Sequence, residues 1–153
     1  MRYEVLIKSK PFSINAATYR DASIKTADYR EWQAQVFHQL NNPVDLETFK
    51  AIKEQFDEKK NSFEVFITAF YPRDVFVTKE NILSSRTIDV TNFEKLLVDL
   101  LFDKQYYSKP HPYGVRNICQ NDKHIIDLHS KKRPHDLDHY LMHVEIRIVD
   151  RPF

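Results

Sequence analysis

The chain has 153 residues, of which 42% are hydrophobic, and its formal net charge is +1. This length is enough to bury one hydrophobic core, so we expect a single domain over residues 1–153. The balanced charge excludes an intensely basic nucleic-acid-binding fold, and the single cysteine, Cys119, excludes an intramolecular disulfide and a cysteine-rich zinc site. No apolar run is long enough to span a membrane and no signal-peptide core follows Met1, so a cytoplasmic protein is expected.

A strand followed by a helix is predicted at the amino end. Residues 3–7 show the alternation of a strand, and Pro11 ends it. A loop to about Lys25 then leads to a helix whose cap is Thr26 or Asp28. The core face of this helix is formed by four residues at helical spacing, Tyr29, Trp32, Val36 and Leu40.

A second helix and a central strand are predicted next. Pro43 suits the first turn of a helix, and Asn61 and Ser62 end that helix. Residues 63–70 are apolar on both faces, as expected of a strand in the middle of a sheet. One face of the second helix carries Leu46, Phe49, Ile52, Lys53 and Phe56.

The carboxy-terminal half predicts a third helix and a hairpin. After a loop over residues 72–85, the helix extends from 92 to 102 and its apolar positions are Phe93, Leu96, Leu97, Leu100 and Leu101. Residues 123–130 and 140–149 predict two strands joined by a connection at 133–138 that is too long for a tight turn. We therefore expect an α+β domain, with a mixed or antiparallel sheet packed on one side by helices.

Polar residues gather at the start of the third helix. Asn92, Lys95 and Asp99 recur at helical spacing and form a stripe that points toward the first turn, where Asp89 lies. Thr91 and Glu94 have the spacing of a capping box. Taken alone, these residues are explained most simply as a helix cap and its solvated neighbours.

Three motifs in this half resemble those of the RusA-type Holliday junction resolvases. They are the run at residues 89–95, the Val-Asp-Leu-Leu sequence at 98–101 that continues it, and the Asn-Asp-Lys-His-Ile sequence at 121–125. In that family an Asp-x-Asp-Asn sequence and a lysine precede or open a helix, and an acidic pair opens a strand after a loop. Thr91 and Asn121 depart from this pattern, because the family commonly has an acid at each position.

The resemblance extends to the amino end of the chain. Residues 11–15, Tyr19 and residues 29–32 resemble the first loop and first helix of the family, whereas residues 40–60 are not covered. The resemblance implies a RusA-like fold and a homodimer that resolves four-way junctions in branched DNA by paired nicks. Members of the family often belong to phages or prophages.

The resemblance also implies which residues act. Nucleases of this kind bind Mg²⁺ between carboxylates, because water is a poor nucleophile and the 3′ oxygen is a poor leaving group. The implied catalytic residues are Asp89, Lys95 and Asp122, and the implied Mg²⁺ ligands are Asp89, Asp122 and Thr91, with Mn²⁺ as the alternative ion. Asn92 and Asp99 would support them.

Several polar and basic residues at loop ends are candidates for contacts with DNA phosphates. Such contacts position a nucleic acid without reading its bases. Each residue, taken singly, is also explained as part of a solvated surface. The candidates are Lys8, Lys10, Asn15, Arg20, Arg86, Lys131, Lys132 and Arg133.

Two other functions remain open. Thr91 and Asn121 lower the number of carboxylates, which favours a protein that binds branched DNA, or a replication partner, without cutting. A histidine-rich metal-dependent hydrolase is the other alternative, since four residues would share one face of a symmetric hairpin, namely Asp127, His129, His143 and Glu145. Polar residues on the exposed face of a hairpin explain the same pattern.

Overall fold

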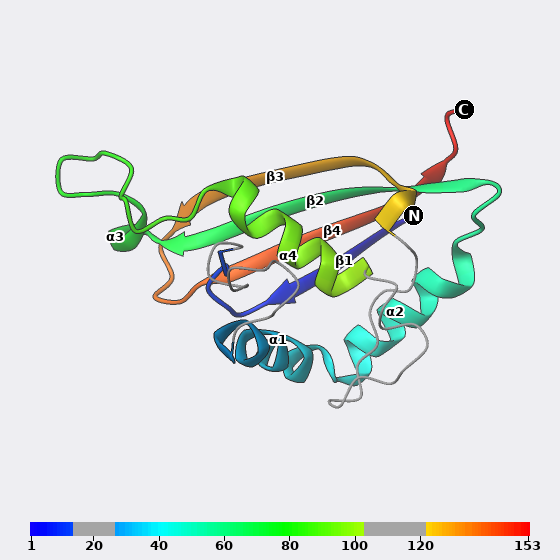
Figure 1. Cartoon of the computed structure of the whole chain (residues 1–153), viewed down its shortest axis with the longest axis horizontal. Coiled ribbons are helices and arrows are strands. Elements are labelled where there is room, and N and C mark those ends of the chain that lie inside the picture. The colour runs from blue at the N-terminus through cyan, green and yellow to red at the C-terminus, as the bar shows by residue number, and fades with distance from the viewer. Residues whose placement is uncertain (14–26, 103–121) are drawn as a thin grey trace.

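The computed structural model describes residues 1–13, 27–102 and 122–153. These residues form an α+β fold in which a four-stranded mixed sheet is covered by helices on one face (Figure 1). The strand order is β1-β4-β2-β3. The strands are β1 (Arg2–Ile7), β2 (Asn61–Pro72), β3 (Ile125–His135) and β4 (Leu141–Asp150).

Three long helices account for most of the helical structure, and the first and third bury all of their predicted apolar positions. The three helices are α1 (Ala27–Leu40), α2 (Pro43–Gln55) and α4 (Val90–Phe102). Of the face predicted for the second, Phe49 and Ile52 are buried, whereas Leu46 is exposed and Phe56 lies just beyond the helix. The predicted core face of α1 is buried. In α2 the side chain of Asn42 accepts a hydrogen bond of 3.0 Å from the Asp45 amide, and Pro43 occupies the first turn, where it has no amide to leave unpaired.

The helices pack on the apolar face of the sheet (Figure 1). In the registers of the central strands, Val65 pairs with Ile146 and Ile67 with Val144, and all four side chains are buried. Helix α4 contributes most to this core, with seven buried residues. Since burying one large apolar side chain contributes about 1.5–3 kcal/mol, α4 is a main source of stability in this domain.

The predicted hairpin is wrong, because β3 and β4 do not pair with each other. Strand β2 lies between them, parallel to β3 and antiparallel to β4. β2 is the most apolar strand and offers two hydrogen-bonding edges, so both carboxy-terminal strands pair with it. As a result β3 is an edge strand, and its charged residues at 131–133 are typical of edges that resist pairing with other chains.

Smaller differences concern the ends of elements. Strand β2 begins at Asn61, within the pair of residues expected to break the helix, and Asp28 lies inside α1 rather than capping it. The predicted loop at 72–85 contains a short helix, α3 (Arg73–Phe76), and a bridge between Val77 and Leu83. Thr26 and the loop at 103–120 lie outside the described residues. In the three ranges that are described, no helix combines the length and apolar composition needed to cross a membrane.

Candidate functional site

Asp89 occupies the position immediately before α4. The Asn92 amide donates a hydrogen bond of 2.9 Å to the Asp89 carbonyl, which closes the first turn of the helix. The Asp89 side chain is exposed, and within the described ranges no hydrogen bond or ion pair engages its carboxylate. Because α4 begins at Val90, Thr91 is the second helical residue, and its predicted role in a capping box is wrong.

The residue before Asp89 is held on both sides by the sheet. The Ile88 amide donates a hydrogen bond of 3.1 Å to the Tyr71 hydroxyl on β2. The Ile88 carbonyl accepts one of 3.3 Å from the Lys132 ammonium on β3, which also donates one of 3.1 Å to the Thr87 hydroxyl. Burial raises the pKa of Tyr71, with the Ile88 bond acting in the opposite direction and Tyr140 raising it further. The phenol is therefore neutral at physiological pH.

The turn that leads to Ile88 is organised around Ser84, which is buried. The Ser84 amide donates to the Phe76 carbonyl at 2.8 Å, and the Thr87 hydroxyl donates to the Ser84 carbonyl at 2.9 Å. Arg86 donates from its guanidinium to the Asp74 carbonyl at 2.7 Å. Part of the hydrogen-bonding capacity of this proposed DNA contact is thus used to tie the turn to α3.

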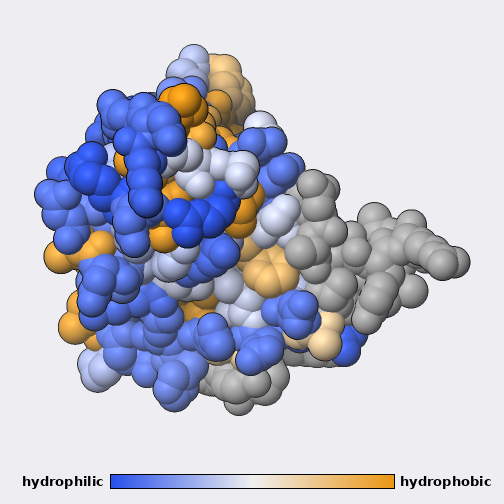
Figure 2. Space-filling view, turned by 90° about the vertical axis from the view of Figure 1, so that its left-hand side faces the viewer, coloured by the Kyte–Doolittle hydropathy of each residue, from blue (hydrophilic) through white to orange (hydrophobic). Residues whose placement is uncertain are grey.

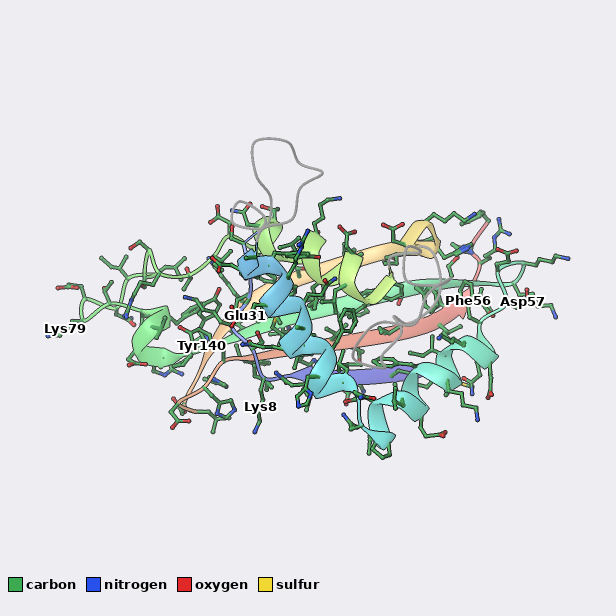
Figure 3. All side chains as sticks on the ribbon, turned by 60° about the horizontal axis from the view of Figure 1, so that its bottom comes forward. Lys8, Glu31, Phe56, Asp57, Lys79 and Tyr140 are labelled. Atoms are coloured by element: carbon green, nitrogen blue, oxygen red, sulfur yellow. The ribbon has the colours of Figure 1, made fainter. Side chains whose placement is uncertain are left out.

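A groove of about 830 Å³ lies beside this segment, and Ile88 forms part of its wall. It runs between the segment after β1, the exposed side of α1 and the connection before β4. Lys8, Glu31 and Tyr140 lie together at this end of the sheet (Figure 3). The ammonium of Lys10 lies 5.8 Å from the centre of the Tyr140 ring. Two of the predicted phosphate contacts therefore line one groove next to Asp89, together with the acids Asp28, Glu31 and Asp138.

The surface at the neighbouring end of the molecule, which carries α3, is mainly hydrophilic. Figure 2 shows polar side chains over most of this face, with apolar ones scattered between them. The turn containing Arg86 lines a shallow hollow on α3 and the loop that follows it. The surroundings of the groove are therefore compatible with a hydrated, charged ligand.

Asp122 lies at the opposite end of α4. It opens a single 3₁₀ turn, η3 (Asp122–His124). The ring centres of His124 and Phe56 lie 5.2 Å apart. Phe56 stacks on Phe63 at 4.2 Å, and Phe63 meets the last residue of α4, Phe102, at 5.5 Å. Phe56 is seen at the far end of the sheet from Lys8 and Tyr140 (Figure 3).

The structure therefore does not bring Asp89 and Asp122 of one chain together. The 13 residues of α4 span about 20 Å, and the two acids lie at its two ends. Ligand oxygens lie about 2.1 Å from a Mg²⁺ ion, so these carboxylates cannot hold one ion within a protomer. The physical reason is the parallel pairing of β2 and β3, since α4 must carry the chain back along the sheet before β3 can begin.

In the predicted polar stripe, Lys95 is paired with Asp99 and not with Asp89. The Lys95 ammonium lies 3.9 Å from the Asp99 carboxylate, one turn further along α4. The Lys95 side chain is 66% exposed, so this pair contributes little to stability. Asn92 contacts Asp89 through its main chain, and Lys95 is directed toward the middle of the helix rather than toward its start.

The other predicted DNA contacts are spread over several surfaces. Lys131 and Arg133 pair with Thr68 and Phe70 of β2 and so lie on the sheet face without helices. Lys132 lies on the helix-covered face, and its ammonium is engaged as described above. Asn15 and Arg20, as well as Asn121, lie outside the described residues. Among the members of this set that the structure describes, only Lys8 and Lys10 line the groove beside Asp89.

The four residues of the histidine-rich alternative do not form a metal site. Strand β2 separates Asp127 and His129 on β3 from His143 and Glu145 on β4. Glu145 instead pairs with Arg2 and, at 2.9 Å, with Arg147, and His129 stacks on the ring of Phe66. Among residues 1–13, 27–102 and 122–153, no three His, Cys, Asp or Glu side chains are grouped as metal ligands.

Two residues of this site could not have been identified from sequence. Tyr71 is 17 positions from its hydrogen-bonding partner Ile88, and Lys132 is 44 positions away. Tyr71 lies just beyond the strand predicted over residues 63–70, and Lys132 is one of three consecutive basic residues. Only the strand order shows that both side chains reach the same peptide segment.

No protein-family model matches the sequence, and no curated protein matches it. The function therefore has to be inferred from the motifs of the chain and from the geometry of the described residues.

Proposed function

We propose that this protein is a Mg²⁺-dependent endonuclease of the RusA type that acts on branched DNA as a homodimer. The observation that carries the proposal is the exposed carboxylate of Asp89 at the start of α4, beside a groove that presents Lys8 and Lys10. Asp89 also belongs to one of the sequence motifs that resemble this family.

The arrangement fits a metal ion that is completed by its substrate. Mg²⁺ commonly takes one or two carboxylates together with waters and phosphate oxygens, and does not need a cage of protein ligands. When bound, the ion lowers the pKa of the attacking water and neutralises charge on the leaving oxygen, and Mn²⁺ can take the same role. Asp89 would hold the ion, and Lys8 and Lys10 would hold neighbouring phosphates. The first amides of α4 offer a further phosphate contact.

The homodimer offers a way for Asp122 to take part. If two α4 helices lie antiparallel across a twofold axis, the start of each helix lies beside the end of the other. Asp89 of one protomer would then share an ion with the partner's Asp122, although the two are about 20 Å apart within a chain. The exposed side of α4, which carries Thr91 and Lys95, is accessible for such a contact.

Symmetry also fits the substrate class. A four-way junction is close to twofold symmetric, and a twofold dimer presents two equivalent sites to opposed strands. Each site would make one nick, so that a pair of symmetric nicks resolves the junction.

A second function, binding of branched DNA without cutting, is favoured by two observations. Within one protomer the described residues provide no cluster of three metal ligands, and Thr91 replaces a carboxylate that the family motif commonly contains. The lysine-lined groove would support binding in either case.

Cleavage of a labelled immobile four-way junction, beside a linear duplex of the same sequence, distinguishes these functions. Wild type with Mg²⁺ or Mn²⁺ should give paired symmetric nicks on the junction alone, and Asp89→Asn should abolish them. Asp74→Asn is a matched control, because Asp74 is an exposed acid on the nearby α3 and does not line the groove. Tight binding of wild type without nicks under either metal would support the second function and contradict the nuclease.

A further inference from the structure

We infer that Lys132 and Tyr71 are positioning residues, which hold the main chain at Ile88 and so fix the place of the adjacent, exposed Asp89 at the start of α4. The inference rests on the proposed function, in which Asp89 binds the metal ion. It assigns to Lys132 a different role from the DNA contact that its place in a basic cluster predicts.

Both main-chain polar groups of Ile88 are hydrogen-bonded to side chains of the sheet. The Ile88 amide is bonded to the Tyr71 hydroxyl at 3.1 Å, and the Ile88 carbonyl to the Lys132 ammonium at 3.3 Å. Asp89 is the next residue, so a shift of Ile88 moves its carboxylate directly. Both side chains come from neighbouring strands of one sheet, in which Ala69 pairs with Lys132 and Tyr71 with Pro134. The two anchors therefore cannot move independently.

Both anchors are themselves held. Tyr71 is fully buried. Its ring centre lies 5.8 Å from that of Phe76 and 5.6 Å from that of Tyr140. The Lys132 ammonium also donates to the Thr87 hydroxyl at 3.1 Å, and that hydroxyl donates onward to the Ser84 carbonyl. A chain of hydrogen bonds thus links the sheet to the turn that precedes the acid.

The Lys132 ammonium donates its hydrogen bonds to the segment that contains Thr87 and Ile88. No carboxylate of the described residues lies within ion-pairing distance of its ammonium, and hydrogen bonds from a charged donor are stronger than neutral ones. Positioning of a catalytic group is valuable because a displacement of about 1 Å can slow a reaction by roughly a hundredfold. Holding Ile88 without engaging the Asp89 carboxylate leaves that group available for a metal ion.

The neighbouring lysine provides a matched control. Lys131 carries the same charge but lies on the opposite face of the sheet, where it lines a separate hollow beside Phe66 and Thr68. Lys131→Met and Lys132→Met therefore make the same chemical change at adjacent positions. Only the second removes a contact with the segment that leads to Asp89.

The experiment measures junction affinity, the single-turnover cleavage rate at saturating protein, and the Mn²⁺ concentration for half-maximal rate. We expect Lys132→Met to lower the rate by about tenfold or more and to raise the Mn²⁺ requirement, with junction affinity unchanged within about twofold. Tyr71→Phe, which keeps the ring and removes only the hydroxyl, should act in the same direction. Lys131→Met should leave amide exchange at residues 86–90 as it is in wild type, because its side chain lies on the other face of the sheet.

Amide hydrogen exchange at residues 86–90 gives a readout that does not depend on cleavage. Exchange should be faster in Lys132→Met and Tyr71→Phe than in wild type or Lys131→Met, because the anchor is lost. If wild type cuts no junction, the proposed nuclease fails while the exchange result still decides whether the anchor exists. The inference is overturned if Lys132→Met leaves rate and exchange unchanged, or if it weakens junction binding as much as it slows cutting.

Discussion

The two ends of α4 differ in how they are held and in what they expose. At its start, hydrogen bonds from Tyr71 and Lys132 fix the main chain at Ile88, and the carboxylate of Asp89 remains exposed beside a groove. At its end, Phe63 stacks on Phe56 and meets the ring of Phe102 edge-on.

The two ends of α4 are therefore stabilised by different kinds of interaction. The aromatic end stabilises the domain, since stacked or edge-to-face rings contribute about 0.5–1.5 kcal/mol per pair beyond the area they bury. The polar end presents an exposed carboxylate, and directional hydrogen bonds fix the main chain beside it. The acids Asp89 and Asp122, one at each end, are therefore not equivalent, and each meets a different environment.

The largest effect on stability is expected at the aromatic end. Phe102→Ala removes a fully buried ring that contacts Phe63, and should lower the free energy of unfolding by about 3–5 kcal/mol. Denaturant unfolding followed by circular dichroism measures the change. Phe153→Ala is the control, because that ring is 78% exposed and its loss should change the free energy by less than about 0.5 kcal/mol. Equal effects of the two variants would contradict the described core.

A smaller loss of stability is expected at the polar end. Tyr71→Phe leaves the Ile88 amide without its partner, which should cost about 1–3 kcal/mol of unfolding free energy. Thermal and denaturant unfolding of the variant beside Tyr140→Phe measures this, since the Tyr140 substitution keeps the Ile88 bond. A variant as stable as wild type would show that this hydrogen bond does not hold the segment.

The aromatic end should also respond to acid. Burial lowers the pKa of His124 from its ordinary 6.5, Lys123 and Arg151 act in the same direction, and Glu58 at 3.7 Å opposes them. The unfolded state then binds a proton before the folded state does, so this histidine contributes stability above pH 6.5 that is lost as pH falls toward the lowered pKa. Between about pH 7.5 and pH 5, wild type should lose more stability than His124→Gln. Parallel pH curves for the two proteins would contradict the assignment.

The smallest effect is expected in the middle of α4. Lys95→Ala removes an ion pair of 3.9 Å between side chains that are 66% and 26% exposed. The free energy of unfolding should change by less than about 0.5 kcal/mol, which denaturant titration at low salt can measure. If junction cleavage also stays at the wild-type rate, Lys95 has no catalytic role.

Local patterns in the sequence predicted the elements, but not which strands pair. The spacing of apolar residues in α1 and the two-sided apolar pattern of β2 were sufficient, because each follows from the period of its element. Alternation in β3 and β4 indicates strands and carries no information on their partner, so both were assigned to one hairpin. That error had a consequence for the site, since only a parallel β2–β3 pair places Asp122 at the far end of α4.

The candidate site could be predicted only in part, because local sequence patterns carry no information on contacts between distant segments. The sequence proposed Asp89, Lys8 and Lys10 as site residues, and the structure places them at one end of the sheet. It could not identify Tyr71 or the true environment of Lys132, because both depend on contacts between distant segments.

In the proposed homodimer, each metal site would use Asp89 of one protomer and the partner's Asp122. The most direct test is junction cleavage by Asp89→Asn, by Asp122→Asn, and by the two variants unfolded, mixed and refolded together. Each variant alone should be inactive. The mixture should regain single nicks, because a mixed dimer has one site with both carboxylates. An inactive mixture would contradict a shared site, and cleavage by Asp122→Asn alone would remove that acid from the mechanism.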